Sequence, residues 1–142
     1  MQTFLPYPLF SMSLECLDNK RLSKQRVEAM QIYNVLTGKT KSKAWQNHPA
    51  VKMWKGYEKA LDCYHNTAIH VWKKRGYKNT MKLIPVSDVT SAEMPPWMGN
   101  DKFHLSHMSN LLRKDPIHYR EFSGYGIPND LPYIWPTKEG MM

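Results

Sequence analysis

Cysteine is scarce in this sequence, and long apolar runs are missing from it. The 142 residues include two cysteines, Cys16 and Cys63, which are too few for a disulfide framework or a cysteine-rich zinc site. No apolar run approaches the roughly 20 residues that cross a bilayer. The first ten residues hold two prolines and lack the basic start of a secretory signal. These absences exclude a disulfide-rich secreted domain and a membrane-spanning protein, and they predict a cytoplasmic protein with reduced thiols.

Acidic residues are also in short supply. Lys and Arg number 20 against 12 Asp and Glu, which gives a formal net charge of +8, and 12% of the residues are aromatic. Cations pair with phosphates and flat rings stack on bases, so this combination favours a nucleic-acid-binding protein. The length is typical of one domain with its own core, and we expect a single domain over residues 1–142.

Metal ligands are the next candidates, because the chain has six histidines. His104 and His107 lie three residues apart, as some metal-binding histidines do. Neither a cysteine motif nor an HExxH pattern accompanies them. We therefore expect neither a metal site nor a cofactor.

The pattern of helix signals predicts an all-α fold with irregular segments. Residues 1–10 should form an extended arm because Pro6 and Pro8 disfavour helix. A short helix capped by Ser11 or Ser13 should follow. Apolar residues at helical spacing then predict three main helices, over residues 20–36, 50–72 and 100–112.

The remaining segments contain most of the prolines and glycines. Residues 77–99 predict a long connection, with a short extended piece at 81–86. Asp115 and Pro116 indicate a short helix toward Phe122. Residues 125–142 should form an irregular tail that packs through its aromatic side chains.

One face of the helix over residues 20–36 carries Lys20, Lys24, Glu28 and Gln31 at spacings of three to four. This face is either a solvated surface, with Lys24 and Glu28 as a helical ion pair, or part of a binding site. Arg26 falls on the apolar side, where a guanidinium needs a carboxylate, a carbonyl or a phosphate as partner. A buried ion pair and a phosphate contact are both open.

Two further polar sets are candidates for phosphate binding. Residues 104–114 place histidines, hydroxyls, an amide and two cations on one helix, which either grips a phosphodiester backbone or forms a plain polar face. Asn47 and His48 precede Pro49 at a helix start, where they cap the helix or hold an anion.

Tryptophans are candidates for stacking on bases. Trp54 and Trp72 lie on the apolar stripe and should belong to the core. Trp45, Trp97 and Trp135 lie in loops and are better placed to stack on bases.

The order of these features resembles phage endonuclease V, a pyrimidine dimer DNA glycosylase with AP lyase activity. The best local match to it is Lys74-Arg75-Gly76-Tyr77, with a weaker one over residues 103–124. A bacterial and phage branch of this family is more similar still. Its members resemble this chain in Asn19-Lys20-Arg21-Leu22, Lys24-Gln25-Arg26-Val27-Glu28, Asn47-His48-Pro49-Ala50, Met53-Trp54 and the run from Ser106-His107 to Lys114. The resemblance covers roughly residues 1–124.

The resemblance implies a DNA-repair glycosylase with AP lyase activity, acting as a monomer on pyrimidine dimers or another modified base in duplex DNA, in the cytoplasm of a bacterium or a phage-infected cell. In the family, the terminal α-amine attacks C1′, displaces the base and leaves an imine, while a Glu manages the protons. This implies Met1 as nucleophile and Glu28 as the carboxylate. A second alignment with the family places its Arg-Val pair on Arg26-Val27. In that alignment, the catalytic position falls on Ser23 instead of Glu28. The DNA contacts implied are Lys20, Arg21, Lys24, Arg26, His48, His107, Arg113 and Lys114.

Position 2 departs from the family pattern. The family nucleophile is typically a small residue exposed when the initiator Met is removed, whereas Gln2 is large and predicts that Met1 is retained. A lyase that uses the amine of Met1 is therefore the leading hypothesis. The alternatives are a glycosylase without lyase activity, a non-catalytic DNA-binding module, and an enzyme on a nucleotide or RNA that uses His48, His107 and Arg113.

Overall fold

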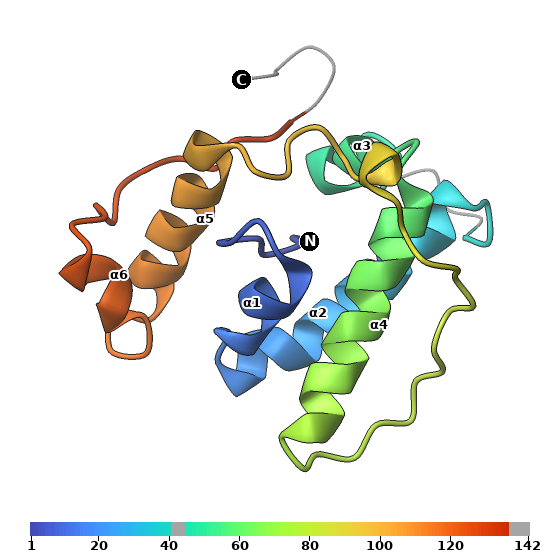
Figure 1. Ribbon diagram of the computed structural model, residues 1–142, viewed down its shortest axis with the longest axis horizontal. Coiled ribbons are helices and arrows are strands. Elements are labelled where there is room, and N and C mark those ends of the chain that lie inside the picture. Colours follow the sequence, from blue (N-terminus) through green and yellow to red (C-terminus); the bar gives the residue numbers. More distant parts are fainter. Residues whose placement is uncertain (41–44, 137–142) are drawn as a thin grey trace.

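The computed structural model describes residues 1–40 and 45–136, and its helices surround the amino-terminal arm (Figure 1). These residues form six α-helices, one short 3-10 helix and no strand, which confirms the all-α class. None of these helices has the length and apolar character needed to cross a membrane. The α-helices are α1 (Phe10–Glu15), α2 (Asn19–Leu36), α3 (Pro49–Trp54), α4 (Glu58–Lys74), α5 (Asp101–Lys114) and α6 (Arg120–Gly124), and the 3-10 helix is η1 (Ser91–Glu93).

Helices α2 and α4 pack against each other, and α1 lies on α4 (Figure 1). The buried side of α2 includes Leu22, Ala29 and Ile32, spaced as one stripe of a helix. The predicted helix over residues 20–36 is confirmed to within one residue. Gly38 follows its end with a φ of 75°, a left-handed conformation that suits glycine.

The prediction of one continuous helix over residues 50–72 is wrong, because the structure breaks it after Trp54 and restarts it at Glu58. Gly56 lies between the two helices with a φ of 90°. Both helices bury apolar side chains in the same core, so the apolar spacing continues across the break and conceals it. Pro49 occupies the first helical position as predicted, and His48 rather than Asn47 caps α3, since its Nδ1 accepts the Ala50 N–H at 3.0 Å.

Helix α1 begins at Phe10, earlier than predicted, and no serine caps it. The Ser13 hydroxyl instead accepts the Tyr7 N–H and donates to the Tyr7 carbonyl, both at 3.0 Å. These two bonds fold the end of the arm back onto α1, so residues 6–10 form bends and a first helical turn rather than an extended segment.

The second half of the chain follows its prediction in part. Asn100 caps α5 by accepting the Phe103 N–H at 3.0 Å. The extended piece expected at 81–86 is not a strand, and the short helix near Phe122 begins only at Arg120. The tail is irregular over residues 125–136, and its last six residues, 137–142, lie outside the described part.

The aromatic core contains one tryptophan that the sequence offered as a candidate for base stacking. Trp54 is fully buried as expected, but the loop residue Trp97 is also buried, at 1% exposure, and its ring packs edge-on against Trp54 with centroids 4.9 Å apart. Trp97 is therefore not a base-stacking residue. Both cysteines are free thiols.

Candidate functional site

The amino-terminal arm passes through the centre of the molecule, where buried polar side chains hold its backbone. Gln25, on α2 and 1% exposed, uses both ends of its carboxamide. Its Oε1 accepts the Phe4 N–H at 2.9 Å and the Tyr64 hydroxyl. Its Nε2 donates to the Gln2 carbonyl at 3.0 Å and to Glu28 Oε2 at 3.2 Å. One amide therefore joins the arm, α4 and the predicted catalytic carboxylate.

Two histidines of α5 hold the next residue of the arm. The Leu5 N–H donates to His107 Nδ1 at 2.8 Å, and the Leu5 carbonyl accepts from His104 Nδ1 at 2.7 Å. The Nε2 of His104 accepts the Gly99 N–H, which leaves the ring proton on Nδ1. Burial lowers the pKa of His107 to about 3, so its ring is neutral. His107 was predicted to contact DNA, but at 1% exposure it supports the arm from inside and does not reach the surface.

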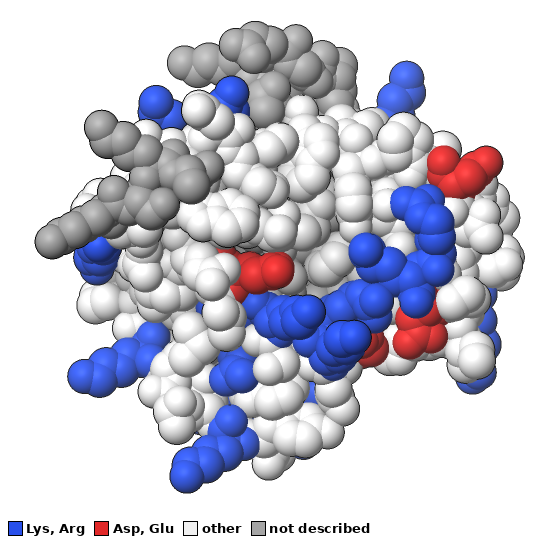
Figure 2. Space-filling model, turned by 180° about the vertical axis from the view of Figure 1, so that it is seen from behind, with Lys and Arg blue, Asp and Glu red and all other residues white. Residues whose placement is uncertain are grey.

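A pocket of about 360 Å³ opens where the arm begins. It collects side chains from the arm, α2, α5 and the tail, which are far apart in the sequence. Its lining consists of Met1, Gln2, Phe4, Lys20, Arg21, Lys24, Gln25, Glu28, Lys114, Tyr133 and Trp135. Figure 2 shows, on the face seen from behind, a band of Lys and Arg beside a hollow that holds an acidic side chain.

The carboxylate of Glu28 lies close to the start of the chain. The backbone N–H of Gln2 donates to Glu28 Oε2 at 3.3 Å. Three covalent bonds separate this nitrogen from the α-amine of Met1, so the two nitrogens are within about 4 Å of each other. The alternative catalytic position, Ser23, is outside the pocket lining and accepts a hydrogen bond from Arg26 Nη2 at 3.1 Å.

Four cations surround the pair of Met1 and Glu28 in the pocket lining, namely Lys20, Arg21, Lys24 and Lys114. Arg21 is held in place by Asp18, since its Nη1 lies 3.1 Å from both carboxylate oxygens. Burial raises the pKa of Asp18, but the hydrogen bonds from Tyr119 and Arg21 lower it more, and the carboxylate stays ionised. The other three cations are the lysines, and none of them has an ion pair among the described residues.

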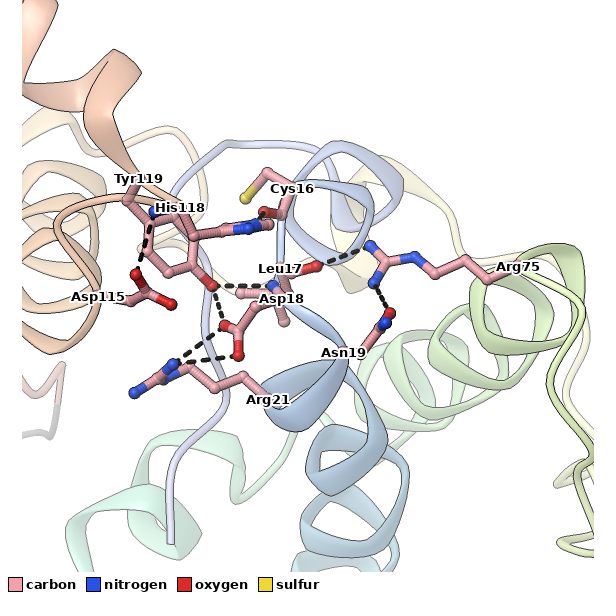
Figure 3. A network of polar contacts seen from close by, with 9 residues as sticks. All are labelled: Cys16, Leu17, Asp18, Asn19, Arg21, Arg75, Asp115, His118 and Tyr119. Atoms are coloured by element: carbon pink, nitrogen blue, oxygen red, sulfur yellow. Dashed lines mark hydrogen bonds and ion pairs between the residues drawn. The ribbon is translucent and has the colours of Figure 1, made fainter.

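Figure 3 shows the polar network that fixes Arg21 at the edge of the pocket. The Tyr119 hydroxyl donates to Asp18 and accepts the Asp18 N–H at 3.0 Å. On the other side of the turn, Arg75 donates to the Leu17 carbonyl at 2.7 Å and to Asn19 Oδ1 at 2.8 Å. The network ties the start of α2 to the end of α4 and the start of α6, which keeps the cationic face of α2 in one orientation.

The other predicted DNA contacts lie outside the pocket lining. Arg26 donates to Asn79 Oδ1 at 2.6 Å and sits over the Trp72 ring, 4.6 Å from its centroid, so its contacts among the described residues are with an amide and an aromatic ring and not with a carboxylate. Arg113 is exposed and donates to the Asn129 carbonyl at 2.7 Å, which ties α5 to the tail.

His48 lies just behind the pocket. Its ring meets Trp135 edge-on with centroids 6.1 Å apart. Burial lowers its pKa, the positive chain terminus lowers it further, and Glu28 acts in the opposite direction. His48 thus lies in the electrostatic field of the terminal amine while its Nδ1 caps α3.

Sequence reasoning missed the site residues Gln25 and Tyr133, among others. Gln25 is polar on a helix whose exposed face is also polar, and only its spacing of three from Glu28 could have indicated that the two meet. Tyr133 lies in the tail, where no periodic pattern predicts its neighbours. Among the described residues, no group of three or more His, Cys, Asp or Glu side chains is arranged to hold a metal ion.

Comparison with known proteins gives one match. A family model described as pyrimidine dimer DNA glycosylase matches residues 1–85, more than half of the chain. The matched segment contains the arm, Gln25, Glu28 and the three cations that α2 contributes, whereas Lys114 and the tail lie beyond it. No curated protein and no solved structure matches the chain.

Proposed function

Since the chain belongs to the pyrimidine dimer DNA glycosylase family, we propose that it removes a damaged base from duplex DNA and then cuts the strand as an AP lyase, with the amine of Met1 as nucleophile. Membership of the family implies a DNA-repair glycosylase and therefore a DNA substrate. The observation that carries the finer proposal is the pocket in which the chain terminus, Glu28 and four cations meet.

The amine is suited to covalent catalysis because a primary amine is a nucleophile that can form an imine with a sugar carbon. Its lone pair attacks C1′ of the damaged nucleotide. The glycosidic bond breaks, and its electron pair leaves with the base, which takes up a proton. Opening of the sugar ring protonates O4′ and leaves an imine between C1′ and the protein.

Glu28 would move the protons in these steps. As a carboxylate, it takes a proton from the attacking amine and returns one to O4′, and it stabilises positive charge that develops at C1′. Loss of a C2′ proton from the imine then expels the 3′ phosphate and cuts the strand. Gln25 supports this role because its Nε2 hydrogen bond, at 3.2 Å, orients Glu28 Oε2 toward the start of the chain.

The cations would bind the phosphates on either side of the damaged nucleotide. Lys20, Lys24 and Lys114 offer three flexible charges, and Arg21 offers a fixed one, because Asp18 already holds its guanidinium. Binding of this kind depends steeply on salt, since each neutralised phosphate releases counterions. We propose no DNA contact for His107, whose ring is buried behind the arm.

The test is borohydride trapping of the protein on duplex oligonucleotides that carry either a pyrimidine dimer or an abasic site, followed by peptide mapping of the adduct. We expect an adduct on the amine of Met1 with both duplexes. Glu28→Gln should abolish or strongly reduce it. Glu121→Gln, which makes the same change at an exposed carboxylate outside the pocket, should leave it intact.

The other outcomes separate the alternatives. An adduct that maps to a pocket lysine would move the nucleophile from Met1 to that side chain. Base release from the dimer duplex without any adduct would indicate a glycosylase without lyase activity. Salt-dependent binding with neither base release nor an adduct would refute catalysis and leave a DNA-binding module.

A further inference from the structure

A second pocket, of about 390 Å³, lies at the far end of α2 and takes no part in the chemistry proposed above. It forms where α3 contacts α2 (Figure 1), and the turn before α3 completes it. We call it the flanking pocket, lined by residues 35–36, 46–47, 51–52 and 55. Among the described residues, its lining shares none with the pocket around Met1 and Glu28.

The flanking pocket has an apolar floor and a basic rim. Val35 and Val51 are buried, and Leu36 is partly buried beside them. Lys52 and Lys55 are exposed, and neither of them has an ion pair in the described part of the chain. The lining, as far as the structure describes it, contains no acidic side chain. A pocket whose charges are all positive attracts an anionic ligand.

Two exposed carboxamides, those of Gln46 and Asn47, complete the rim. The cap of α3 is His48, so capping does not occupy the Asn47 side chain. Side-chain amides bind phosphate oxygens, as lysine ammonium groups do. The apolar floor suits the C–H surface of deoxyribose, and the rim suits phosphate. The composition therefore fits the backbone of a DNA strand, in which sugar and phosphate alternate.

The flanking pocket lies on the same face of α2 as the candidate catalytic carboxylate. Lys24, Glu28, Gln31 and Val35 follow one another at spacings of four, three and four, which places them along one side of the helix. Glu28 and Val35 are thus two helical turns apart, which is about 10 Å along the axis. The phosphates of one strand advance about 3.4 Å each along the axis of duplex DNA, so this distance corresponds to about three base pairs.

The cations of the two pockets lie on opposite sides of Glu28. Along α2, Lys20 and Lys24 precede Glu28, whereas the flanking pocket follows it with Lys52 and Lys55. A duplex extends in both directions from a damaged nucleotide, and cations on one side alone would leave its other half without contacts. Phosphate contacts on both sides fix the register of the duplex on the protein.

We propose that the flanking pocket binds the DNA backbone about three base pairs from the damaged nucleotide, with a sugar on the apolar floor and phosphates at Lys52 and Lys55. This inference rests on the proposed function, because it places the damaged nucleotide at Glu28. Lysines at phosphates hold a duplex without reading its sequence. The flanking pocket therefore orients the duplex and does not select the lesion.

The first measurement is the salt dependence of binding to a duplex with one pyrimidine dimer and about 10 base pairs, one helical turn, on each side. All proteins carry Glu28→Gln, so that the duplex stays uncleaved. Lys52→Ala/Lys55→Ala should lower the slope of log affinity against log salt by about 1.8, which is about 60-fold in affinity at 0.1 M salt. The matched control is Lys78→Ala/Lys82→Ala, at two exposed lysines outside both linings, and its slope should change by less than about 0.5.

The second measurement locates the contact on the DNA. Single methylphosphonate groups, which are uncharged, replace one phosphate at a time along both strands of the dimer duplex. In the protein with both lysines, neutral groups about two to four base pairs from the dimer on one side should weaken binding. In Lys52→Ala/Lys55→Ala the same groups should have no effect, whereas neutral groups next to the dimer should weaken binding by both proteins alike.

Equal salt slopes with and without the two lysines, or an unchanged methylphosphonate pattern, would overturn the flanking pocket while the proposed function stands. An equal loss in the control variant would also overturn it, because the effect would then come from net charge alone. Neither measurement requires catalysis. A protein that gives neither base release nor a borohydride adduct would refute the proposed function, and the two binding measurements would still decide the inference.

Discussion

Gln25→Met should destabilise the protein far more than any other glutamine-to-methionine change on α2. Methionine keeps much of the length and volume of the side chain but removes all four hydrogen bonds of the buried amide. Tyr64 keeps a partner, because its hydroxyl also donates to the Phe4 carbonyl at 2.9 Å. The Phe4 N–H and the Gln2 carbonyl lose the buried partner that Gln25 provides.

Each unsatisfied buried group costs about 1–3 kcal/mol, so the variant should lose about 2–6 kcal/mol of its free energy of unfolding. For a denaturant dependence of about 2 kcal/mol/M, a central loss of about 4 kcal/mol lowers the urea midpoint by about 2 M. The assay is urea unfolding followed by circular dichroism. Gln31→Met, at an exposed position of the same helix, is the control and should change the stability by less than about 0.5 kcal/mol. If the two variants have the same midpoint, the arm is not held by Gln25 and the reasoning fails.

Three further predictions address the helix break, a buried histidine and the cations. Gly56→Ala should destabilise the protein by about 1–2 kcal/mol, because φ is 90° at this position. Gly124→Ala lies in a helix with open space for a Cβ and should stabilise the protein by about 0.5–1 kcal/mol. Thermal unfolding of the two variants checks the opposite signs. His107 has a pKa of about 3 in the folded protein, so between about pH 6.5 and 3 its ring is protonated in the unfolded chain and neutral in the folded one. The free energy of unfolding therefore falls as the pH drops from about 6.5 toward 3. His107→Asn, which keeps an acceptor but cannot titrate, should reduce that slope by about 1.4 kcal/mol per pH unit, and unchanged slopes in urea unfolding from about pH 6 to 4 would contradict this. Lys24→Ala should lower the slope of log affinity against log salt by about 1 in DNA-binding titrations, while Lys82→Ala, exposed and outside the pocket lining, should not.

The sequence predicts those parts of the fold in which a local signal decides the structure. The spacing of Leu22, Ala29 and Ile32 is enough for α2, and Asn100 marks the start of α5. The break at Gly56 is not predicted, because the apolar residues keep their helical spacing on both sides of it. A single glycine is weak evidence for a helix end when the periodic pattern around it is long. The burial of Trp97 is not predicted either, because Trp97 lies in a loop without a periodic pattern. Such a residue is buried only when elements distant in the sequence pack over it.

The candidate site divides in the same way. Glu28 and the cations of α2 could be named from one helix, because residues three and four apart share a face. Their meeting with Met1, Lys114 and Trp135 depends on contacts across the whole chain, and no local pattern encodes these. The roles of the histidines differ from the prediction for a related reason. A histidine on a polar helix looks the same in sequence whether it faces phosphate or, like His107, a buried N–H.

Burial of the arm supports the proposal that the chain terminus serves as a catalytic group. Terminal residues usually fray, and a nucleophile on a frayed end would lose its orientation toward the carboxylate. Here Phe4 and Leu5 are buried and bound through both their N–H and their carbonyl groups, so the residues that precede them are held beside Glu28. The size of Gln2 then has a physical reason. Its side chain is buried at the pocket lining and its N–H donates to Glu28, so residue 2 would anchor the terminus if Met1 presents the amine as proposed.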